Sequence, residues 1–487
     1  MSLKVYNSES QKKELFEPLE AGKVRMYVCG PTVYDLLHVG NFRGAVVFNM
    51  VRNWLEKQGF EVTYVYNYTD VDDKIINRAK QEGVTPEEIS EKYIAEFQKD
   101  YQSLNLRPHS HNPRVTEHMQ AIVDFVAELI KKGHAYELDG DVYYHVPSFK
   151  DYGKLSHKNL EDLEAGFRIE VDERKKHPAD FALWKKSSDT APGMAWDSPW
   201  GKGRPGWHIE CSAMSKGLLG ERIDIHGGGM DLIFPHHENE IAQSEGCTGQ
   251  QFVKYWMHNN MVNFGDQKMS KSLGNVVTGR SFLEKYNAEI LKFLMLSAHY
   301  RSPVDLSEAQ VLRSVGGLAR IYSSLTWAEK LLKVQADLVP LPEKFQQAID
   351  AAEEGITQAL NDDFNTPEVL ARIFEVVRLF NQQCRTPGKP RPEHRAMAEV
   401  FFHWLKDKGS VMALFQESPG DFLNLLDDML LEQKGLERSK IDELVQRRFA
   451  AREQKDYATS DELRKTLEDM GISVQDTAEG SLWEVHK

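Results

Sequence analysis

Two β-rich runs on either side of a helical pattern constrain the fold of this chain more than any other feature. The runs are residues 24–29 and 60–66. Between them, apolar residues recur at helical spacing from Asn41, which can cap a helix, to Gly59, which can end it. A strand, a helix and a strand in this order favour two parallel strands joined by a right-handed crossover. The sequence therefore predicts an α/β fold built on a Rossmann-like parallel sheet.

The rest of the chain changes in character three times. Residues from about 110 to 205 are rich in charged residues, histidine, tryptophan and turn signals, which indicates an insertion into the α/β domain. A further α/β stretch follows, with a strand expected at 222–225. Helical periodicity replaces strand signals from about 305 to 405, with a Pro-rich break at 386–392, and the last 50 residues form a small, charge-dense unit. A length of 487 residues suits about three domains.

The overall charge argues against a general nucleic-acid binder. The chain has 60 Lys and Arg against 74 Asp and Glu, a net charge of −14, whereas binding to phosphates needs concentrated positive charge. Residues 436–465 depart from this average, with eight basic against seven acidic residues. The N-terminus has no apolar signal core, no apolar run is long enough to span a membrane, and the four cysteines form no disulfide framework. We therefore expect a cytoplasmic protein with no membrane partner.

The segment His38-Val39-Gly40-Asn41 lies between the first expected strand and the helix that follows it. Backbone N–H groups at a helix N-terminus, with a glycine that permits close approach, form a phosphate site, and a histidine beside it can donate to a phosphate oxygen. A structural turn explains the same four residues about equally well, so this segment alone leaves both interpretations open.

Two lysines and two hydroxyl groups are concentrated in the run 268–272, which lies between Gly265 and Gly274. The lysines are Lys268 and Lys271, and a short loop of this composition suits a mobile clamp on an anion. The alternative is an ordinary exposed basic loop, which is the commoner meaning of a lone Lys-Ser run.

Four residues of metal-binding type form a third candidate site. His236 and Glu240 are four residues apart, which places them on one face of a helix. Cys29 ends the first expected strand and Cys211 begins a helix-like segment, although each alone is more typical of a small buried hydrophobic residue. A Cys/Cys/His/Glu set would suit zinc, because soft thiolates exclude Mg²⁺. Separation along the sequence does not by itself show that the four side chains meet.

Missing motifs exclude two other classes of enzyme. Residues 226–229 (HGGG) are similar to an esterase oxyanion loop, but the chain has no Gly-x-Ser-x-Gly elbow. It also lacks the Gly-x-x-x-x-Gly-Lys-Ser/Thr phosphate loop. The sequence therefore argues against a hydrolase of that kind and against a P-loop enzyme.

Taken together, segments 38–41 and 268–272 resemble the two signatures of class I aminoacyl-tRNA synthetases, usually HIGH and KMSKS. The second signature is intact, whereas Val39 replaces Ile and Asn41 replaces the final His of the first. Four further segments resemble the cysteinyl-tRNA synthetase family in particular and extend the resemblance over nearly the whole chain: 29–35 (CGPTVYD), 68–74 (YTDVDDK), 206–212 (GWHIECS) and 226–240.

The resemblance implies one zinc ion per chain, with the ligands Cys29, Cys211, His236 and Glu240. In the family this zinc takes the thiolate of the amino acid directly, and its preference for a soft, acidic ligand separates cysteine from serine. The residues implied to contact the amino acid are Cys29, Gly30, Thr69 and Trp207. For Trp207, a place in the core is the alternative.

The resemblance further implies a two-step reaction. ATP with Mg²⁺ activates L-cysteine to cysteinyl-adenylate by an in-line displacement that relies on positioning and charge stabilisation, and the cysteinyl group then moves to the 3′ end of tRNA(Cys). The residues expected to bind ATP are His38, Gly40, Asn41 and Lys271. Lys268 and Lys271 are expected to close over the leaving pyrophosphate, which makes the expected catalytic set His38, Gly40, Asn41, Lys268 and Lys271.

The implied organisation has three parts. Residues 1–305 would form the catalytic domain, including the insertion and the Lys268–Ser272 loop, residues 306–425 an α-helical bundle, and residues 426–487 a small α+β anticodon-binding unit. The residues implied to contact anticodon bases are Arg452, Tyr457, Asp461 and Asp476. A solvated charged helix would have the same composition. The chain is expected to be a monomer whose partners are tRNA(Cys), L-cysteine and ATP.

Two other functions share many of these features. One is a ligase that uses the same catalytic domain to join activated cysteine to an amino-sugar, as in mycothiol synthesis, but relatives of that kind lack the anticodon unit. The other is a synthetase-like binding protein without catalysis, for which the altered Asn41 is the only support. Incubation with ATP, labelled cysteine and tRNA would separate all three.

Overall fold

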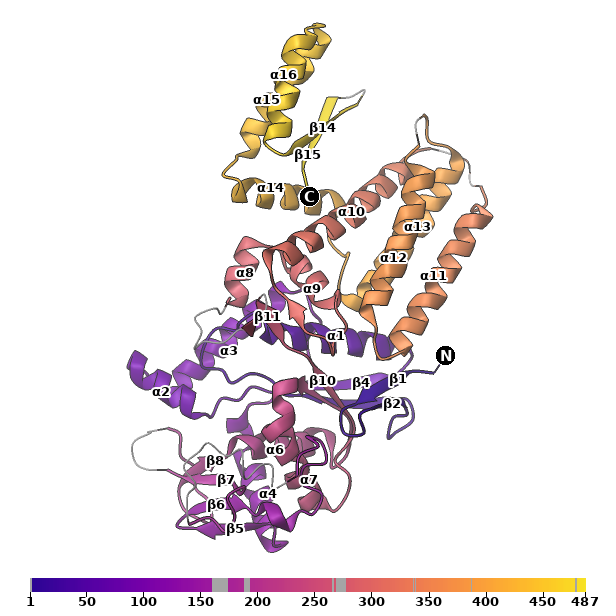
Figure 1. The fold of residues 1–487 in the computed structure, drawn as a ribbon. Helices are drawn as coiled ribbons and strands as arrows, with labels where there is room; N and C mark the ends of the chain where they lie inside the picture. The colour runs from indigo at the N-terminus through magenta and orange to yellow at the C-terminus, as the bar shows by residue number, and fades with distance from the viewer. Residues whose placement is uncertain are drawn as a thin grey trace.

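The structure is a computed structural model that describes residues 2–159, 174–187, 193–264, 267–268, 277–335, 337, 339–386, 388–477 and 480–487. The molecule is elongated, with a parallel sheet near its middle, the insertion at one end and a small C-terminal unit at the other (Figure 1). A helical bundle lies between the sheet and the C-terminal unit. This architecture confirms the predicted fold class.

Four parallel strands form the central sheet in the order β10-β9-β3-β4. β3 (Lys23–Val28) and β4 (Glu61–Tyr66) lie where the two β-rich runs predict them. β9 (Ile223–Gly229) is longer than the expected strand, because it continues through the three glycines, and it pairs with β10 (Val253–Asn259) along its length. In sheets of this kind ligands bind beyond the carboxyl ends of the strands.

Helix α1 (Asn41–Lys57) packs against the sheet and forms the predicted crossover between β3 and β4. Its close approach depends on a glycine of β9, because a Cβ at Gly227 would lie 2.3 Å from the ring of Phe48. Gly227, one of the glycines that obscure the strand signal in the sequence, therefore allows the helix and the sheet to pack.

The other elements of the N-terminal half surround this sheet. In chain order they are β1 (Lys4–Asn7), β2 (Lys12–Leu15), α2 (Asp73–Glu82), α3 (Pro86–Ser103), α6 (Trp207–Leu219), η3 (Met230–Leu232), η4 (Ile233–His237) and α7 (Glu238–Thr248). β1 and β2 form an antiparallel hairpin.

The insertion contains an antiparallel sheet in the order β5-β6-β7-β8. Its helix α4 packs against α6 and α7, so the insertion rests on the helices that follow it in the chain. The elements are η1 (Val115–His118), α4 (Met119–Lys131), β5 (Ala135–Leu138), β6 (Asp141–Tyr144), η2 (Val146–Ser148), β7 (Phe181–Lys186) and β8 (Gly203–Pro205).

A small sheet, β12-β11-β13, connects the central sheet to the helical bundle. Its strands are β11 (Val262–Phe264), β12 (Gln267–Lys268) and β13 (Val304–Asp305). Two helices, α8 (Gly279–Lys285) and α9 (Ala288–Leu296), lie between β12 and β13 in the chain. The bundle consists of α10 (Glu308–Leu332), α11 (Glu343–Asn361), α12 (Thr366–Cys384) and α13 (Pro392–Met412). The Pro-rich break separates α12 from α13, as predicted.

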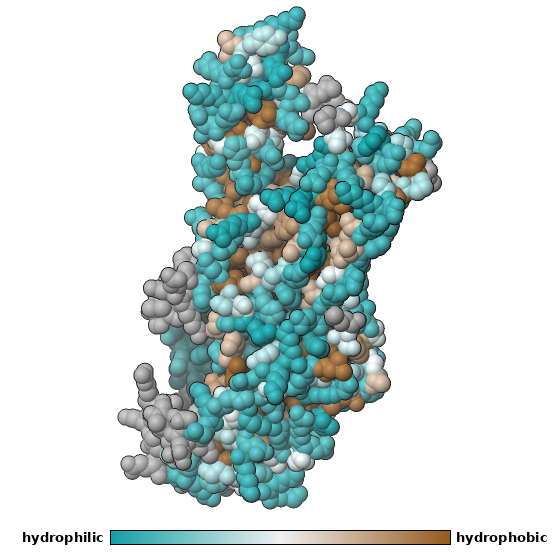
Figure 2. All heavy atoms as spheres, turned by 45° about the vertical axis from the view of Figure 1, so that its right-hand side comes forward, coloured by the Kyte–Doolittle hydropathy of each residue, from teal (hydrophilic) through white to brown (hydrophobic). Residues whose placement is uncertain are grey.

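The C-terminal unit follows α14 (Pro419–Gln433), which packs against α10. It consists of α15 (Arg438–Glu453), α16 (Tyr457–Asp469) and the hairpin of β14 (Ile472–Thr477) and β15 (Gly480–Val485). Hydrophilic residues cover most of the face in Figure 2, including this unit at its top. Among the helices in the described ranges, none combines the length and the apolar character needed to cross a membrane.

Candidate active site and metal centre

The carboxyl edge of the central sheet holds four metal-binding side chains from separate parts of the chain. Cys29 follows β3, Cys211 lies near the start of α6, and His236 and Glu240 lie one helical turn apart where η4 runs into α7. Their ligand atoms all lie within 4.8 Å of one another, with Cys29 half-buried and the other three buried. The structure thus brings together the four residues that the resemblance selects, here called the four-ligand cluster.

The distances within this cluster match the edges of a coordination tetrahedron. A Zn–S distance of about 2.3 Å predicts about 3.8 Å between two sulfurs, and a Zn–N or Zn–O distance of about 2.1 Å predicts about 3.6 Å from sulfur to nitrogen or oxygen. The Cys29 Sγ lies 3.7 Å from the Cys211 Sγ and 3.5 Å from the His236 Nε2. Its distance to the Glu240 Oε1 is 3.6 Å. The four donors therefore fit one zinc ion.

Charge within the cluster also suits a cation. A hydrogen bond from Cys29 lowers the pKa of Cys211 to about 6, although burial opposes this shift. Burial raises the pKa of the Glu240 carboxyl, but His226 and His236 outweigh it and hold that pKa at about 2. Burial lowers the pKa of His236, but Glu240 and Cys211 raise it to about 10. A thiolate and a carboxylate are thus ionised near neutral pH, the forms that bind metals, whereas His236 would have to release its proton when a metal binds.

A second candidate set shares Cys29 and Glu240 but takes its other donors from His226 and His237. The two histidines have partners of their own, since the His226 Nε2 lies 2.9 Å from the Glu240 Oε2, within the set, and the His237 Nδ1 lies 2.7 Å from the His258 Nε2, outside it. This set also has one sulfur rather than two, and thiolates favour zinc. His226 is therefore better placed to orient Glu240, whose other oxygen faces the four-ligand cluster.

Sequence reasoning missed the side chains that hold the ligands in place. The His208 Nδ1 lies 3.0 Å from the His236 Nδ1, so the opposite ring nitrogen of His236 faces the cluster. Asn67, fully buried after β4, accepts a 3.0 Å hydrogen bond from the Gly30 N–H and lies 3.3 Å from the Thr69 Oγ1. The only signal was their position inside or beside the segments that carry the family resemblance.

The three further residues expected to contact the amino acid lie around the cluster. A Cβ at Gly30 would lie 1.7 Å from the Asn67 carbonyl oxygen, so a larger residue would displace the backbone next to Cys29. Thr69 is buried. Trp207 is 40% exposed and its ring centroid lies 4.3 Å from that of His236, so Trp207 is a surface residue of the site and not part of the core.

A pocket of about 310 Å³ lies beside the cluster and is here called the glycine-lined pocket. Its walls include Cys29, His38, Gly40, Asn41 and Gly228. The expectation that Asn41 caps α1 is wrong, because Gly40 precedes the first turn and the Asn41 Oδ1 accepts a 3.0 Å hydrogen bond from the His38 N–H. The start of α1 nevertheless lines the pocket, where the positive end of its helix dipole suits a phosphate, although the Asn41 N–H already donates to the His38 carbonyl oxygen at 2.9 Å.

The second signature lies only partly within the described residues. Lys268 ends β12, whereas Met269–Ser272, including Lys271, fall outside them. Shortly after this run, Thr278 forms an antiparallel bridge with His38 of the first signature. The first signature is therefore joined by backbone hydrogen bonds to the segment at Val277 and Thr278, a link that the sequence did not predict.

The residues expected to contact the anticodon are distributed over the C-terminal unit. Tyr457, at the start of α16, is 63% exposed, and Asp461 is exposed on the same helix. Asp476 on β14 accepts hydrogen bonds from Arg448 at 2.6 and 3.0 Å and also from Arg452. The bonds from Arg448 are the main reason that the pKa of Asp476 is lowered. The structure thus pairs Arg452 with Asp476 and leaves Tyr457 facing solvent.

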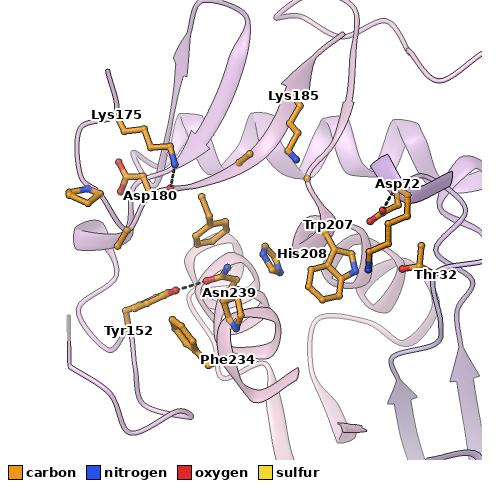
Figure 3. A pocket seen from close by; sticks show the side chains of 17 residues that line it. Thr32, Asp72, Tyr152, Lys175, Asp180, Lys185, Trp207, His208, Phe234 and Asn239 are labelled. Carbon is orange, nitrogen blue, oxygen red and sulfur yellow. Dashed lines mark hydrogen bonds between the residues drawn. The ribbon is translucent and has the colours of Figure 1, made fainter. Parts of the chain in front are cut away.

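A larger pocket, of about 670 Å³, lies between the insertion and the helices that carry the metal ligands, and is here called the insertion pocket (Figure 3). Among the residues expected to form the site, Trp207 alone lines it. The other labelled residues of its wall include Tyr152, Lys175, Lys185, His208 and Phe234.

Comparisons with known proteins agree with these features. A family model described as the tRNA synthetases class I (C) catalytic domain matches residues 15–316. A DALR domain model matches residues 356–416, and a model of the cysteinyl-tRNA ligase anticodon binding domain matches residues 438–483. The matches together cover most of the catalytic part, the second half of the bundle and most of the C-terminal unit.

Among curated proteins, the cysteine–tRNA ligase of Bdellovibrio bacteriovorus is 59% identical over 486 residues, and that of Geobacter metallireducens is 47% identical over 498 residues. Each alignment covers 100% of both chains. Among solved structures, Mycobacterium tuberculosis methionyl-tRNA synthetase in complex with methionyl-adenylate superposes with a TM-score of 0.62 at 13% identity, covering 83% of this chain and 94% of that one. At that identity the likeness shows the fold alone.

Proposed function

Because the chain belongs to the cysteinyl-tRNA synthetase family and is an ATP-dependent ligase that charges tRNA with cysteine, we propose that it selects its amino acid through one zinc ion held by the four-ligand cluster. The observation that carries this proposal is the agreement of the three sulfur-centred distances with tetrahedral zinc coordination. When bound, the zinc ion would accept the thiolate of cysteine and disfavour the harder, less acidic hydroxyl of serine.

The protein's own residues would position the amino acid beside the metal. The exposed face of Trp207 would cover the cysteine side chain, while buried Thr69 and the backbone at Gly30 would bound its other end. Asn67 supports this arrangement, since it bonds both to the Gly30 N–H and to the Thr69 side chain. The site would thereby hold the carboxylate of cysteine towards the glycine-lined pocket.

We assign ATP, with Mg²⁺, to the glycine-lined pocket. The start of α1 at Gly40 and Asn41 would hold phosphate oxygens through the Gly40 N–H and the positive end of the helix dipole, and His38 would donate a further hydrogen bond. The cysteine carboxylate is already anionic and needs no strong base, so its in-line attack on the α-phosphorus depends on positioning and charge stabilisation. Lys268 and Lys271 would close over the departing pyrophosphate.

Lys271→Ala is expected to slow cysteine-dependent ATP–pyrophosphate exchange by roughly 10–100-fold with little change in the KM for cysteine, because it removes charge stabilisation of the leaving group. Lys285→Ala, an exposed lysine of α8, is the matched control and should leave exchange unchanged. Exchange at the wild-type rate in Lys271→Ala would contradict the assignment.

We further propose the division into a catalytic part (1–305), a bundle (306–425) and an anticodon-binding unit (426–487), in which Arg452, Tyr457, Asp461 and Asp476 would face anticodon bases. The 63% exposure of the Tyr457 ring supports a stacking role. To contact an anticodon base, Arg452 would have to break its hydrogen bond with Asp476 and form one with the base.

Tyr457→Ala is expected to raise the KM for tRNA by roughly 5-fold or more, since base–aromatic stacking contributes about 1–3 kcal/mol. Exchange, which needs no tRNA, should be unchanged, and Tyr457→Phe should behave like the wild type because it keeps the ring. Equal KM values in all three proteins would refute a stacking role.

One assay tests the function as a whole. The purified chain, ATP, radiolabelled cysteine and tRNA(Cys) are expected to yield labelled, alkali-labile cysteinyl-tRNA, with about one zinc per chain in the protein. We also propose that the chain acts in the cytoplasm, which its four free cysteines support, and that it is a monomer. Sedimentation velocity should show a single species of one-chain mass.

A further inference from the structure

A buried ion pair on α9 lies at the junction between the catalytic part and the helices that follow it. Glu289 and Lys292 are about one helical turn apart, with 3.4 Å between the Glu289 Oε2 and the Lys292 Nζ, and each side chain is only 2% exposed. Charged side chains are rarely so buried unless they are paired, and apolar residues of the same volume often stabilise a protein equally well. The main effect of the pair therefore lies in the geometry that it fixes.

Both side chains hold the short connection between α13 and α14. The Lys292 Nζ donates to the Ala413 carbonyl oxygen, and the Glu289 Oε1 accepts a hydrogen bond from the Phe415 N–H. Ala413 and Phe415 have φ values of 54° and 60°, in the left-handed region that residues other than glycine rarely adopt. A residue held there costs of order 1–3 kcal/mol and persists only where its surroundings fix it. The pair thus stabilises a turn that the backbone alone disfavours.

The turn leads into α14, which lies between α10 and the C-terminal unit (Figure 1). The Tyr322 hydroxyl of α10 donates to the Glu289 Oε1 at 2.7 Å, and the Tyr322 ring stacks on Phe422 of α14, with 4.0 Å between the ring centroids. Farther along α14, buried Asp427 accepts a 3.0 Å hydrogen bond from the Val485 N–H of β15. Direct contacts therefore connect α9 to the hairpin of the C-terminal unit.

The distance between the two ends of the molecule matters for a substrate that has to reach both. The amino acid is proposed to lie at the four-ligand cluster near the middle of the molecule, and the anticodon at the C-terminal unit at one end (Figure 1). A folded tRNA keeps its anticodon and its 3′ end at a fixed separation. Two linked contacts can raise the overall affinity by about 10²–10⁴-fold, but this gain is lost when the geometry prevents both from forming at once.

We infer that Glu289 and Lys292 are positioning residues that fix the anticodon-binding unit at the distance from the active site that a full-length tRNA requires. The inference rests on the proposed function, because it needs both an anticodon contact and transfer of the cysteinyl group to the 3′ end. Neither residue lines the glycine-lined pocket or the insertion pocket. Loss of the pair should therefore impair the charging of full-length tRNA and spare the activation of cysteine.

The test compares a double variant with the wild type on two RNAs. Glu289→Met/Lys292→Met keeps two long side chains and removes both charges together, so that no buried charge is left unpaired. Its kcat/KM for charging full-length tRNA(Cys) is expected to fall by about 10–50-fold, whereas its kcat/KM for a minihelix of the acceptor stem alone should stay within about 2-fold of the wild type. Arg372→Met/Glu375→Met, which removes an exposed ion pair of the same spacing on α12, is the control and should change neither value.

Two further variants separate positioning from general stability. Glu289→Gln/Lys292→Met also lacks the ion pair, but its amide oxygen can still accept from the Phe415 N–H and the Tyr322 hydroxyl, so it should recover at least about half of the wild-type charging of full-length tRNA. If Glu289→Met/Lys292→Met fails to fold, Tyr322→Phe decides the question. It removes one bond to the Glu289 carboxylate, keeps the ring on Phe422, and should lose about 3–5-fold with full-length tRNA alone.

Cysteine-dependent ATP–pyrophosphate exchange, which needs no tRNA, should stay within about 2-fold of the wild type in each variant and shows that it is folded. An equal loss with the minihelix and with full-length tRNA would indicate a general defect of the catalytic part and overturn the inference. Wild-type charging of full-length tRNA by Glu289→Met/Lys292→Met would overturn it as well. Failure of the proposed function is distinguishable, because the wild type itself would then charge full-length tRNA no better than the minihelix, or not at all.

Discussion

Replacing Cys211 with serine is expected to abolish cysteine activation, with a loss of at least about 10³-fold in cysteine-dependent ATP–pyrophosphate exchange. Serine keeps the size of the side chain but offers a hard hydroxyl that stays protonated, whereas the pKa of the Cys211 thiol is held at about 6 by its hydrogen bond with Cys29. Altering a group that merely orients a ligand costs roughly 10–100-fold in metal affinity, so loss of a ligand should cost more.

Two measurements check this result. Atomic absorption should find about one zinc per wild-type chain and well under half of that in Cys211→Ser, and a chelator should reduce wild-type exchange to the level of the variant. Cys247→Ser is the matched control: Cys247 is also a buried, helical cysteine, but its sulfur lies 3.8 Å from the Lys216 ammonium and outside the cluster. It should retain both zinc and exchange. Full activity in Cys211→Ser would remove the zinc proposal.

Part of the fold is readable from the sequence because local and global preferences agree. The runs around β3 and β4 are apolar, short and separated by an amphipathic helix, so their pairing follows from the crossover rule. The carboxyl half of β9 cannot be predicted, because glycine disfavours strands and its three glycines are explained by close contacts that only the fold shows, such as that of Gly227 with Phe48. The prediction that Asn41 caps α1 is wrong because the Asn41 side chain can accept a hydrogen bond either from the first turn of the helix or from the preceding loop. In the structure it accepts from the His38 N–H of the loop.

The candidate site likewise has one part that the sequence predicts and another that only the structure shows. The i, i+4 spacing of His236 and Glu240 is a local property and predicts a shared helix face, and the family resemblance supplies the two cysteines. The structure adds that the sulfurs of Cys29 and Cys211 come within 3.7 Å of each other across 182 residues of chain. The insertion pocket could not be predicted, because its lysines and its aromatic wall come from segments that meet only after the insertion packs on α6 and α7.

A buried cation joins the proposed ATP site to the strand that carries Lys268. Arg43, in the first turn of α1, is fully buried and donates from Nη2 to the carbonyl oxygens of His299, Tyr300 and Ser302, at 3.0, 3.2 and 2.6 Å. Burial lowers its pKa to about 10, so the guanidinium stays charged at neutral pH. The segment that it holds leads directly into β13, which pairs with β11, the neighbour of β12.

Arg43→Met is therefore expected to destabilise the catalytic domain by about 3–5 kcal/mol, because three carbonyl oxygens lose a charged donor that is fully buried while the apolar length of the side chain is kept. The stability of Arg43→Lys should lie between those of the wild type and Arg43→Met, since an ammonium keeps the charge but lacks the planar fork of the guanidinium. Calorimetry of the full chain should show a lower temperature for the first unfolding transition.

The same variant should lose activity before it loses its fold. Below the unfolding transition, ATP–pyrophosphate exchange in Arg43→Met should drop by roughly 10-fold, because β11–β13 and hence Lys268 are no longer tied to the start of α1. Arg25→Met is the control, since Arg25 forms a partly exposed ion pair with Glu20 that should contribute no more than about 1 kcal/mol. If Arg43→Met unfolds at the wild-type temperature, the three carbonyl contacts do not stabilise the domain; if it unfolds earlier but exchanges normally, Arg43 supports the fold without positioning the catalytic loop.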